Sequence, residues 1–293
     1  SNKSTSIEFP SENIHHLNYT SNDSLLLKTQ FQVMSNMIMD HTIGQHICLI
    51  GPKGSGKSMI AREFALATGF TSPRVFPLYN ELTSRDMLQK RIIDENGNTS
   101  WSDSPLTLAA REGGLCILDG IHTLDVHVLY SLRRLLMDGI INLPSGEAIT
   151  VGSSFRIIAL SLPPTLTSGE NASKALDGHL RYITCDLGFT YHYLPQGTPE
   201  DMQELLTKTL NKYPESDKVS TILTDCLTCL SEVAGTNHPE LKPSYRHALL
   251  IGRKFLSKEI MDINTLKLSI RNTLENTFLI RFMPGIVANL FNN

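Results

Sequence analysis

The chain has 293 residues, with 26 basic and 29 acidic side chains and a formal net charge of −3 at pH 7. This near balance provides no electrostatic footprint for strong nucleic-acid binding, so we expect no nucleic-acid partner. The apolar runs are far shorter than the roughly 20 residues that a membrane-spanning helix needs, and we expect no membrane span. Five cysteines, an odd number, with two in apolar strand-like runs, indicate reduced thiols and an intracellular location.

The N-terminal part of the chain changes character after about 22 residues. Residues 1–22 are rich in Ser, Asn and Thr, a composition that predicts a mobile N-terminal arm. Apolar residues then recur at helical spacing over 25–41, and Gly44 is a helix stop.

The next segment alternates between strand and helix patterns. The predicted strands are 47–50, 74–79, 115–119 and 155–160, and the predicted helices between them are 58–68, 84–91 and 125–138. A βαβ rhythm of this kind implies an α/β fold with a parallel sheet and helices on both faces.

Two turn-centred segments interrupt the α/β pattern, and a change to helices only marks the end of the core. Residues 139–151 read as a hairpin around a Pro-Ser-Gly-Glu turn, and 94–98 read as a second turn. After Pro195 the pattern is helical only, with predicted helices at 199–212, 216–234, 243–258 and 263–281. We therefore expect an αβ core over 23–194 and a small all-helical lid domain over 195–293.

A glycine-rich turn follows the first predicted strand. Residues 51–58 read Gly-Pro-Lys-Gly-Ser-Gly-Lys-Ser, which matches the phosphate-binding pattern G-x-x-x-x-G-K-[ST] between a strand and a helix. Backbone N–H groups of such a turn, together with the helix N-terminus, hold phosphate oxygens. The predicted nucleotide contacts here are Gly51, Pro52, Lys53, Gly54, Ser55, Gly56, Lys57, Ser58 and Met59. Lys57 is expected to reach the β- and γ-phosphates, and Ser58 to bind Mg²⁺.

A second motif supplies the other magnesium residue. The apolar run 114–118 ends in Asp119, as a Walker B strand requires. Asp119 is therefore expected to hold Mg²⁺ together with Ser58. The following residue is Gly120, where most hydrolysing P-loop ATPases of the AAA+ type have a glutamate that orients the attacking water.

These motifs, followed by a helical lid, resemble the AAA+ ATPases. The hairpin before the 155–160 strand and the phrase Trp-Ser-Asp-Ser-Pro-Leu at 101–106 resemble the midasin, dynein-related and MoxR branch. The segments 78–91, 119–122 and 155–160 are similar to the second AAA module of the family of von Willebrand factor A domain-containing protein 8, whose members are large, multi-module mitochondrial ATPases. The resemblance covers roughly residues 17–285.

The resemblance implies further roles, several of which this chain fills only partly. Arg246, in Ser-Tyr-Arg, resembles the lid arginine that contacts the γ-phosphate. The usual sensor asparagine is missing from the Ser-Leu-Pro stretch at 161–163, so only Ser161 can take a weaker form of its role. Arg181 lies near the expected arginine finger, although the surrounding pattern differs and a surface loop arginine is an equal reading. His122 is a candidate to hydrogen-bond the attacking water, and its alternative is a loop or helix-cap residue.

Three functions remain open from the sequence. The leading one is an AAA+ module that binds Mg·ATP or ADP and hydrolyses ATP slowly, or only beside neighbouring modules or subunits in a ring. The second is a structural module that holds nucleotide to brace the ring and performs no chemistry. A small-molecule kinase is the third, and the long helical lid and the hairpin argue against it. The mitochondrial location follows from the resemblance alone.

Overall fold

The computed structural model describes residues 26–93, 97–163, 187–211, 216–234, 242–256 and 263–278. The predicted mobile arm over 1–22 and Arg181 lie outside these residues. The chain divides into two compact units, one containing Ser1–Pro52 and Lys57–Leu194, the other Lys53–Gly56 and Pro195–Asn293. Each unit is described separately below.

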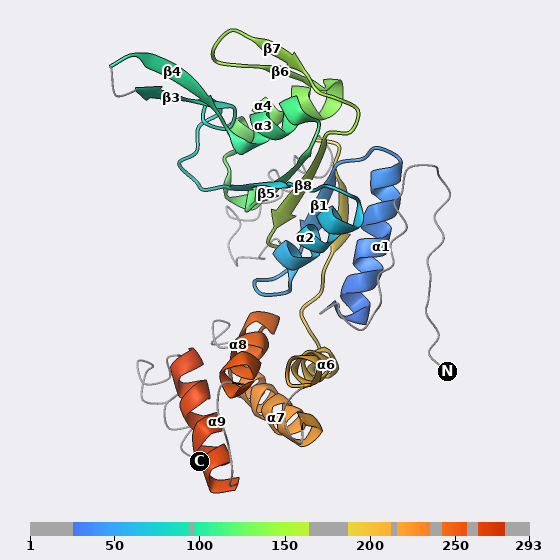
Figure 1. The fold of residues 1–293 in the computed structure, drawn as a ribbon, viewed down its shortest axis with the longest axis vertical. Helices are drawn as coiled ribbons and strands as arrows, with labels where there is room; N and C mark the ends of the chain where they lie inside the picture. The colour runs from blue at the N-terminus through green and yellow to red at the C-terminus, as the bar shows by residue number, and fades with distance from the viewer. Residues whose placement is uncertain are drawn as a thin grey trace, which may run out of the picture. The chain divides into compact units, whose positions relative to one another are not determined.

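The first unit is built on a sheet of five strands in the order β2-β5-β8-β1-β9 (Figure 1). These strands are β1 (Ile47–Ile50), β2 (Arg74–Pro77), β5 (Leu115–Asp119), β8 (Arg156–Ser161) and β9 (Thr190–Tyr193). Every neighbouring pair is parallel. All the strand C-termini therefore meet at one edge of the sheet, where α/β folds bind their ligands.

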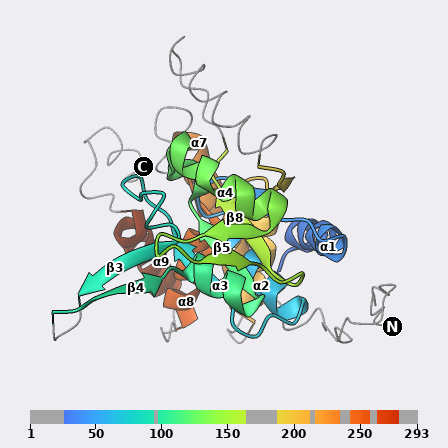
Figure 2. The same ribbon diagram turned by 90° about the horizontal axis from the view of Figure 1, so that it is seen from above.

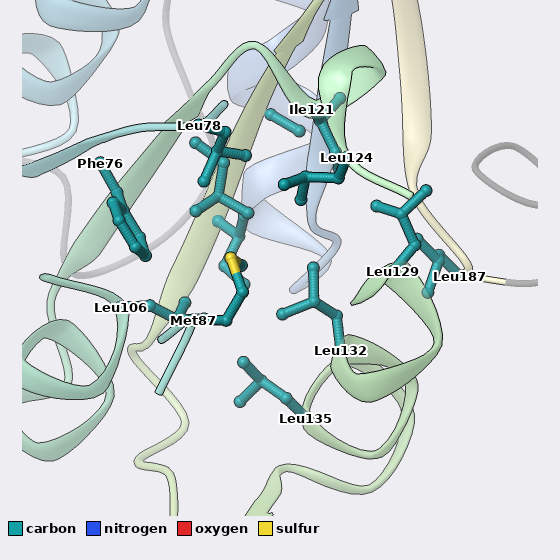
Figure 3. Packing of buried hydrophobic residues seen from close by; sticks show 14 of the residues in the cluster. Phe76, Leu78, Met87, Leu106, Ile121, Leu124, Leu129, Leu132, Leu135 and Leu187 are labelled. Carbon is teal, nitrogen blue, oxygen red and sulfur yellow. The ribbon is translucent and has the colours of Figure 1, made fainter. Parts of the chain in front are cut away.

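Helices cover both faces of this sheet, which confirms the predicted α/β architecture. Side chains alternate along a strand, so Leu49 and Ile117 pack with α1 (Lys28–Thr42) and α2 (Lys57–Ala67). Ile157 and the cysteines of β1 and β5 pack on the other face with α3 (Pro105–Glu112) and α4 (Val126–Asp138), as the cluster in Figure 3 illustrates in part.

The cysteines in these strands are core residues. Cys48 and Cys116 are buried, and the four cysteines of the described residues are free. Burial raises the pKa of the Cys48 thiol to about 12 and also raises that of Cys116. Both thiols are therefore neutral at pH 7 and behave as small apolar side chains.

The predicted helix over 84–91 is wrong. Its second half belongs to β3 (Gln89–Ile93), which pairs antiparallel with β4 (Thr99–Asp103). Ile92 and Ile93 are β-branched and prefer extended backbone, and the pairing across the hairpin outweighs the short apolar spacing that suggested a helix. Figure 2 shows this hairpin extending away from the sheet.

The hairpin predicted over 139–151 is confirmed by the antiparallel pairing of β6 (Ile140–Asn142) and β7 (Ala148–Thr150). The side chain of Gln89 joins it to the β3–β4 hairpin. Gln89 Oε1 accepts the N–H of Ser145 at 3.1 Å, and its Nε2 donates to Asp103 Oδ1 at 2.7 Å. The two hairpins lie at the same end of the first unit in Figure 1.

In the described residues after Leu194, the regular elements of the second unit are all helices, as the sequence predicts. It contains α6 (Pro199–Thr209), α7 (Ser216–Ala234), α8 (Tyr245–Leu256) and α9 (Ile263–Phe278). Helix α6 packs against α7 and α8, and α8 packs against α9. The first helix begins with a capping box, in which Thr198 and Asp201 each accept the backbone N–H of the other.

Candidate functional site

The glycine-rich turn lies between β1 and α2, as the motif requires. Gly54 and Gly56 have φ of +77° and +94°, a left-handed conformation that glycine adopts without steric cost. The turn is held to the sheet at its start, since the N–H of Gly51 donates to the carbonyl of Ser161 at 3.1 Å. Helix α2 begins at Lys57, so its N-terminal N–H groups and positive dipole end lie directly after the turn.

Lys57 turns its ammonium group back onto this loop. Its Nζ donates to the carbonyl oxygens of Gly51 at 2.7 Å and Pro52 at 2.8 Å. Next along the helix, Ser58 is exposed and Met59 is half-buried. A positive charge, a helix N-terminus and left-handed glycines together form a surface suited to phosphate oxygens.

The remaining residues of the motif differ in their exposure. Gly51 and Ser55 are buried, Pro52 is half-buried and Lys53 is exposed. Because the expected contacts of this turn use backbone N–H groups, an exposed side chain at Lys53 is compatible with its predicted role.

Asp119 ends β5 at the same edge of the sheet. It stands in register with Leu160 of β8, and Ser161 of β8 stands in register with Ile50 of β1. One strand therefore separates Asp119 from the strand that leads into the turn. Ser161 is buried, and its Oγ donates to the carbonyl of Leu162 at 2.9 Å. The fold thus brings the turn, Ser161 and Asp119 to one edge.

The residue after Asp119 has an unusual backbone. Gly120 has φ of +94° and ψ of 34°, a left-handed conformation. A Cβ at this position would lie 3.3 Å from the carbonyl oxygen of Leu78. The sequence shows that a carboxylate is absent here, but the left-handed backbone and the close carbonyl are features that only the structure reveals.

His122 lies in the short 3₁₀ helix η1 (Ile121–Thr123) that follows Gly120. Its Nδ1 accepts the backbone N–H of Leu162 at 3.3 Å. Thr123 closes the same turn, because its Oγ1 donates to the carbonyl of Gly120 at 2.8 Å. No local pattern in the sequence indicates the His122 bond, because its partner lies 40 residues away along the chain.

Arg246 belongs to the second unit. It is the second residue of α8 and its side chain is exposed. Its neighbour His247 is tied down locally, since Nδ1 of His247 accepts the N–H of Ser244 at 3.2 Å. Burial, followed by the charge of Arg246, lowers the pKa of His247.

No group of three or more His, Cys, Asp or Glu side chains among the described residues is arranged to hold a metal ion by itself. The oxygen donors of Ser58 and Asp119 are of the kind that Mg²⁺ prefers, and Mg²⁺ in nucleotide sites usually takes only one or two protein ligands beside phosphate and water. The residues present therefore fit a magnesium ion that arrives with a nucleotide.

The comparison with protein families agrees with this geometry. Residues 46–178 match the model of the AAA domain (dynein-related subfamily). The chain carries an AAA domain of the dynein-related subfamily. The matched segment runs from just before β1 past the end of β8, so this AAA domain contains the glycine-rich turn, Asp119 and Ser161.

Similar proteins include von Willebrand factor A domain-containing protein 8 of Mus musculus, which is 30% identical over 88% of this chain. This chain spans only 14% of the mouse protein. Protein CbbQ of Hydrogenophilus thermoluteolus is 34% identical over 38% of this chain and 41% of its own length. The resemblance to the dynein-related AAA domains and to von Willebrand factor A domain-containing protein 8, expected from the sequence, is confirmed.

Solved structures confirm the fold class, an α/β AAA core followed by a helical part. NtrX from Brucella abortus, in complex with ADP, matches with a TM-score of 0.53 and 16% identity, over 93% of this chain and 62% of that one. The RuvB Holliday junction branch migration motor of Thermotoga maritima matches with a TM-score of 0.50 and 13% identity, over 83% and 68%. Within the described residues, no helix is long and apolar enough to cross a membrane.

Proposed function

We propose that this AAA domain binds Mg·ATP or Mg·ADP at the turn formed by residues 51–58. The observation that carries the proposal is the placement of Lys57, whose ammonium lies within hydrogen-bond distance of two loop carbonyls at the N-terminus of α2. In the bound state this ammonium leaves those carbonyls for phosphate oxygens. The structure of NtrX in complex with ADP supports nucleotide as the ligand of this fold.

The other residues take the following roles in the proposal. Loop N–H groups from Lys53 to Lys57 bind phosphate oxygens, and Ser58 and Asp119 hold Mg²⁺. Ser161 supplies a polar contact at the end of β8, and Arg246 reaches the γ-phosphate from the helical unit. When bound, the magnesium ion neutralises charge on the phosphates.

We further propose that hydrolysis is slow or depends on a neighbouring module. Gly120 has no carboxylate to orient a water, and its left-handed backbone beside Leu78 leaves little room for one. This same observation favours the second candidate, a module that holds nucleotide without hydrolysing it. Turnover that depends on Lys57 separates the two.

The wider setting of the domain is also part of the proposal. The mouse relative is several times longer than this chain, which supports a module that works beside others, in one chain or in a ring of subunits. Such neighbours complete each nucleotide site in the family that the sequence resembles. A mitochondrial location rests on that resemblance, and fractionation of cells that produce the protein tests it.

The first experiment measures ATP and ADP affinity and steady-state ATP turnover on one preparation. Lys57→Ala is the test variant, and Lys53→Ala is its matched control. Both variants remove one lysine from the same loop, but Lys53 is exposed and its backbone N–H survives the substitution. We expect Lys57→Ala to lose at least tenfold in ATP affinity and Lys53→Ala to stay near the wild type.

Three results have distinct meanings. Binding with turnover that Lys57→Ala abolishes supports the ATPase. Tight binding with no turnover that depends on Lys57 supports the structural module. Equal affinity of both lysine variants, or no binding by the wild-type protein with Mg²⁺ present, contradicts nucleotide binding at this turn.

A further inference from the structure

Both backbone polar groups of Leu162, the residue that follows β8, form hydrogen bonds. Its N–H donates to His122 Nδ1 at 3.3 Å, and its carbonyl accepts the hydroxyl of Ser161 at 2.9 Å. The carbonyl of Ser161 in turn accepts the N–H of Gly51 at 3.1 Å. Because the Ser161 carbonyl and the Leu162 N–H belong to one peptide unit, two of these bonds connect the turn after Asp119, through the end of β8, to Gly51. The bond of the Ser161 hydroxyl lies within the segment itself.

The bond to Leu162 also fixes the protonation of the His122 ring. A ring nitrogen that accepts a hydrogen bond carries no proton, so the ring is neutral and its proton is on Nε2. The lone pair of Nδ1 is engaged by Leu162, and Nε2 has none to offer. In this arrangement His122 has no nitrogen available to take a proton from water, which argues for a role other than general base.

The place of this link in the sheet indicates which part of a nucleotide it affects. Under the proposed function, Lys57 and the loop after β1 contact phosphates of both ATP and ADP, although Lys57 also reaches the third phosphate of ATP. Asp119 at the end of β5 helps to hold the Mg²⁺ that bridges the second and third phosphates, and Ser161 lies at the end of the neighbouring strand. Ser161 is the polar side chain at the end of β8. Movement of the Ser161–Leu162 peptide therefore affects ATP more than ADP.

We propose that His122 is a positioning residue that fixes the Ser161–Leu162 segment through Leu162 N–H and thereby sets the preference of the site for ATP over ADP. The inference rests on the proposed nucleotide binding at residues 51–58. It assigns His122 a role in ligand discrimination, in place of the water-binding role that the sequence suggested.

Two substitutions of His122 test whether its hydrogen-bond acceptor, and not the rest of the imidazole ring, is what matters. In His122→Asn, the amide Oδ1 occupies nearly the place of Nδ1 and can still accept the N–H of Leu162, whereas His122→Leu has no acceptor. Thr123→Val is the matched control, because it removes a side-chain hydrogen bond whose two partners, Thr123 and Gly120, both lie in the same turn.

The experiment measures dissociation constants for ATP and ADP with Mg²⁺, together with the melting temperature of each variant. We expect His122→Leu to weaken ATP binding by about five- to tenfold, the range that corresponds to loss of one hydrogen bond, with ADP binding changed less than twofold. His122→Asn and Thr123→Val keep the ratio of the two constants near that of the wild type.

A second route covers the case in which His122→Leu does not fold. Ser161→Ala removes the hydroxyl that donates to Leu162, and we expect it to lower the same ATP-to-ADP preference. We expect the double variant Ser161→Ala/His122→Asn to show the same decrease in ATP-to-ADP preference as Ser161→Ala alone.

Several outcomes overturn the inference. One is an equal loss of ATP and ADP affinity in His122→Leu, which indicates a purely structural role. Another is a loss of ATP turnover in both His122→Leu and His122→Asn with unchanged affinities for ATP and ADP, which would indicate that His122 acts on the attacking water. If the wild-type protein binds neither nucleotide, the proposed function itself is contradicted. If the wild type binds both, but His122→Leu and Ser161→Ala leave the ratio of the ATP and ADP dissociation constants unchanged, only the role of His122 is contradicted.

Discussion

His46 Nδ1 accepts the backbone N–H of Ile157 at 3.1 Å, so a histidine just before β1 holds the beginning of β8. His122 does the same for Leu162 at the other end of the strand. The central strand of the five-stranded sheet is therefore fixed at both ends by neutral imidazole rings. Arg156 lies close enough to His46 for its charge to oppose protonation of that ring.

The first prediction is a loss of stability in acid. Burial, followed by the charge of Arg156, lowers the pKa of His46 and of His41 from the ordinary value of 6.5 to about 4. The unfolded chain binds these protons at higher pH than the folded chain. The contribution of these two histidines to the free energy of unfolding is therefore constant above about pH 7 and falls as the pH decreases from 6.5 towards 4. Urea unfolding at a series of pH values measures this slope.

His46→Asn isolates one of the two groups. Its side-chain oxygen can accept the N–H of Ile157 but does not titrate, so the slope below pH 6.5 decreases by up to about 1.4 kcal/mol per pH unit. His192→Asn is the control, since His192 bonds Asp40 of α1 instead of β8. An unchanged slope in His46→Asn contradicts the assignment of the acid transition to this histidine.

The second prediction concerns the left-handed glycine after Asp119. Gly120→Ala places a Cβ on a backbone with φ of +94° and 3.3 Å from the carbonyl oxygen of Leu78. An L-residue in this conformation costs about 1–2 kcal/mol, and the close carbonyl adds to it. Gly146→Ala is the matched control, because Gly146 has φ of +92° and no atom within 4 Å of the added Cβ. Chemical denaturation should show a larger loss for Gly120→Ala, and equal losses would exclude a contribution from Leu78.

How far the sequence predicts this fold depends on how local each signal is. The strand ending at Ile50, the loop after it and the strand ending at Asp119 are short segments whose own residues define them, and they are observed as predicted. The β3–β4 hairpin was misjudged because the strand over 99–103 that pairs with β3 lies farther along the chain than the segment from which the helix over 84–91 was predicted. Strand β9 escaped prediction because its four residues pair only with distant β1.

The candidate site divides in the same way. Lys57, Ser58 and the missing carboxylate at Gly120 can be identified from motif positions. The conformation of Gly120 and the bond between His122 and Leu162 depend on how strands separated in sequence are arranged, and no local pattern encodes them. Sequence motifs therefore identify the ligand class, and the tertiary contacts suggest how the site distinguishes ligands.

The third prediction tests the packing of the helical unit. The hydroxyl of Tyr245 in α8 donates to Asp201 Oδ2 in α6 at 2.9 Å, and the same oxygen accepts the N–H of Thr198. Tyr245 is 5% exposed, so Tyr245→Phe removes a partly buried bond to a carboxylate and should lower the free energy of unfolding by about 1.5–3 kcal/mol. Tyr193→Phe is the control, since Tyr193 is 59% exposed. Similar values for the two variants would show that the bond between α8 and α6 contributes little.

The fourth prediction concerns the link between the two hairpins. Gln89 is 4% exposed and bonds both Asp103 of β4 and the N–H of Ser145 in the β6–β7 turn. Arg111 reinforces the link from α3, with Nε on Asp103 at 2.7 Å and its other nitrogens on Glu147. Gln89→Leu leaves a partly buried N–H and a carboxylate oxygen without this partner, which should cost about 1–3 kcal/mol.

Hydrogen exchange of the intact chain distinguishes this link from a local defect. If Gln89 joins the hairpins, Gln89→Leu increases backbone exchange in both the 99–103 and the 140–150 segments. Lys90→Leu is the matched control, because it introduces the same side chain at the next, exposed position of β3 and leaves both bonds intact. Faster exchange confined to the β3–β4 hairpin would mean that Arg111 alone suffices to hold the β6–β7 turn. The side chain of Gln89 would then stabilise only its own hairpin.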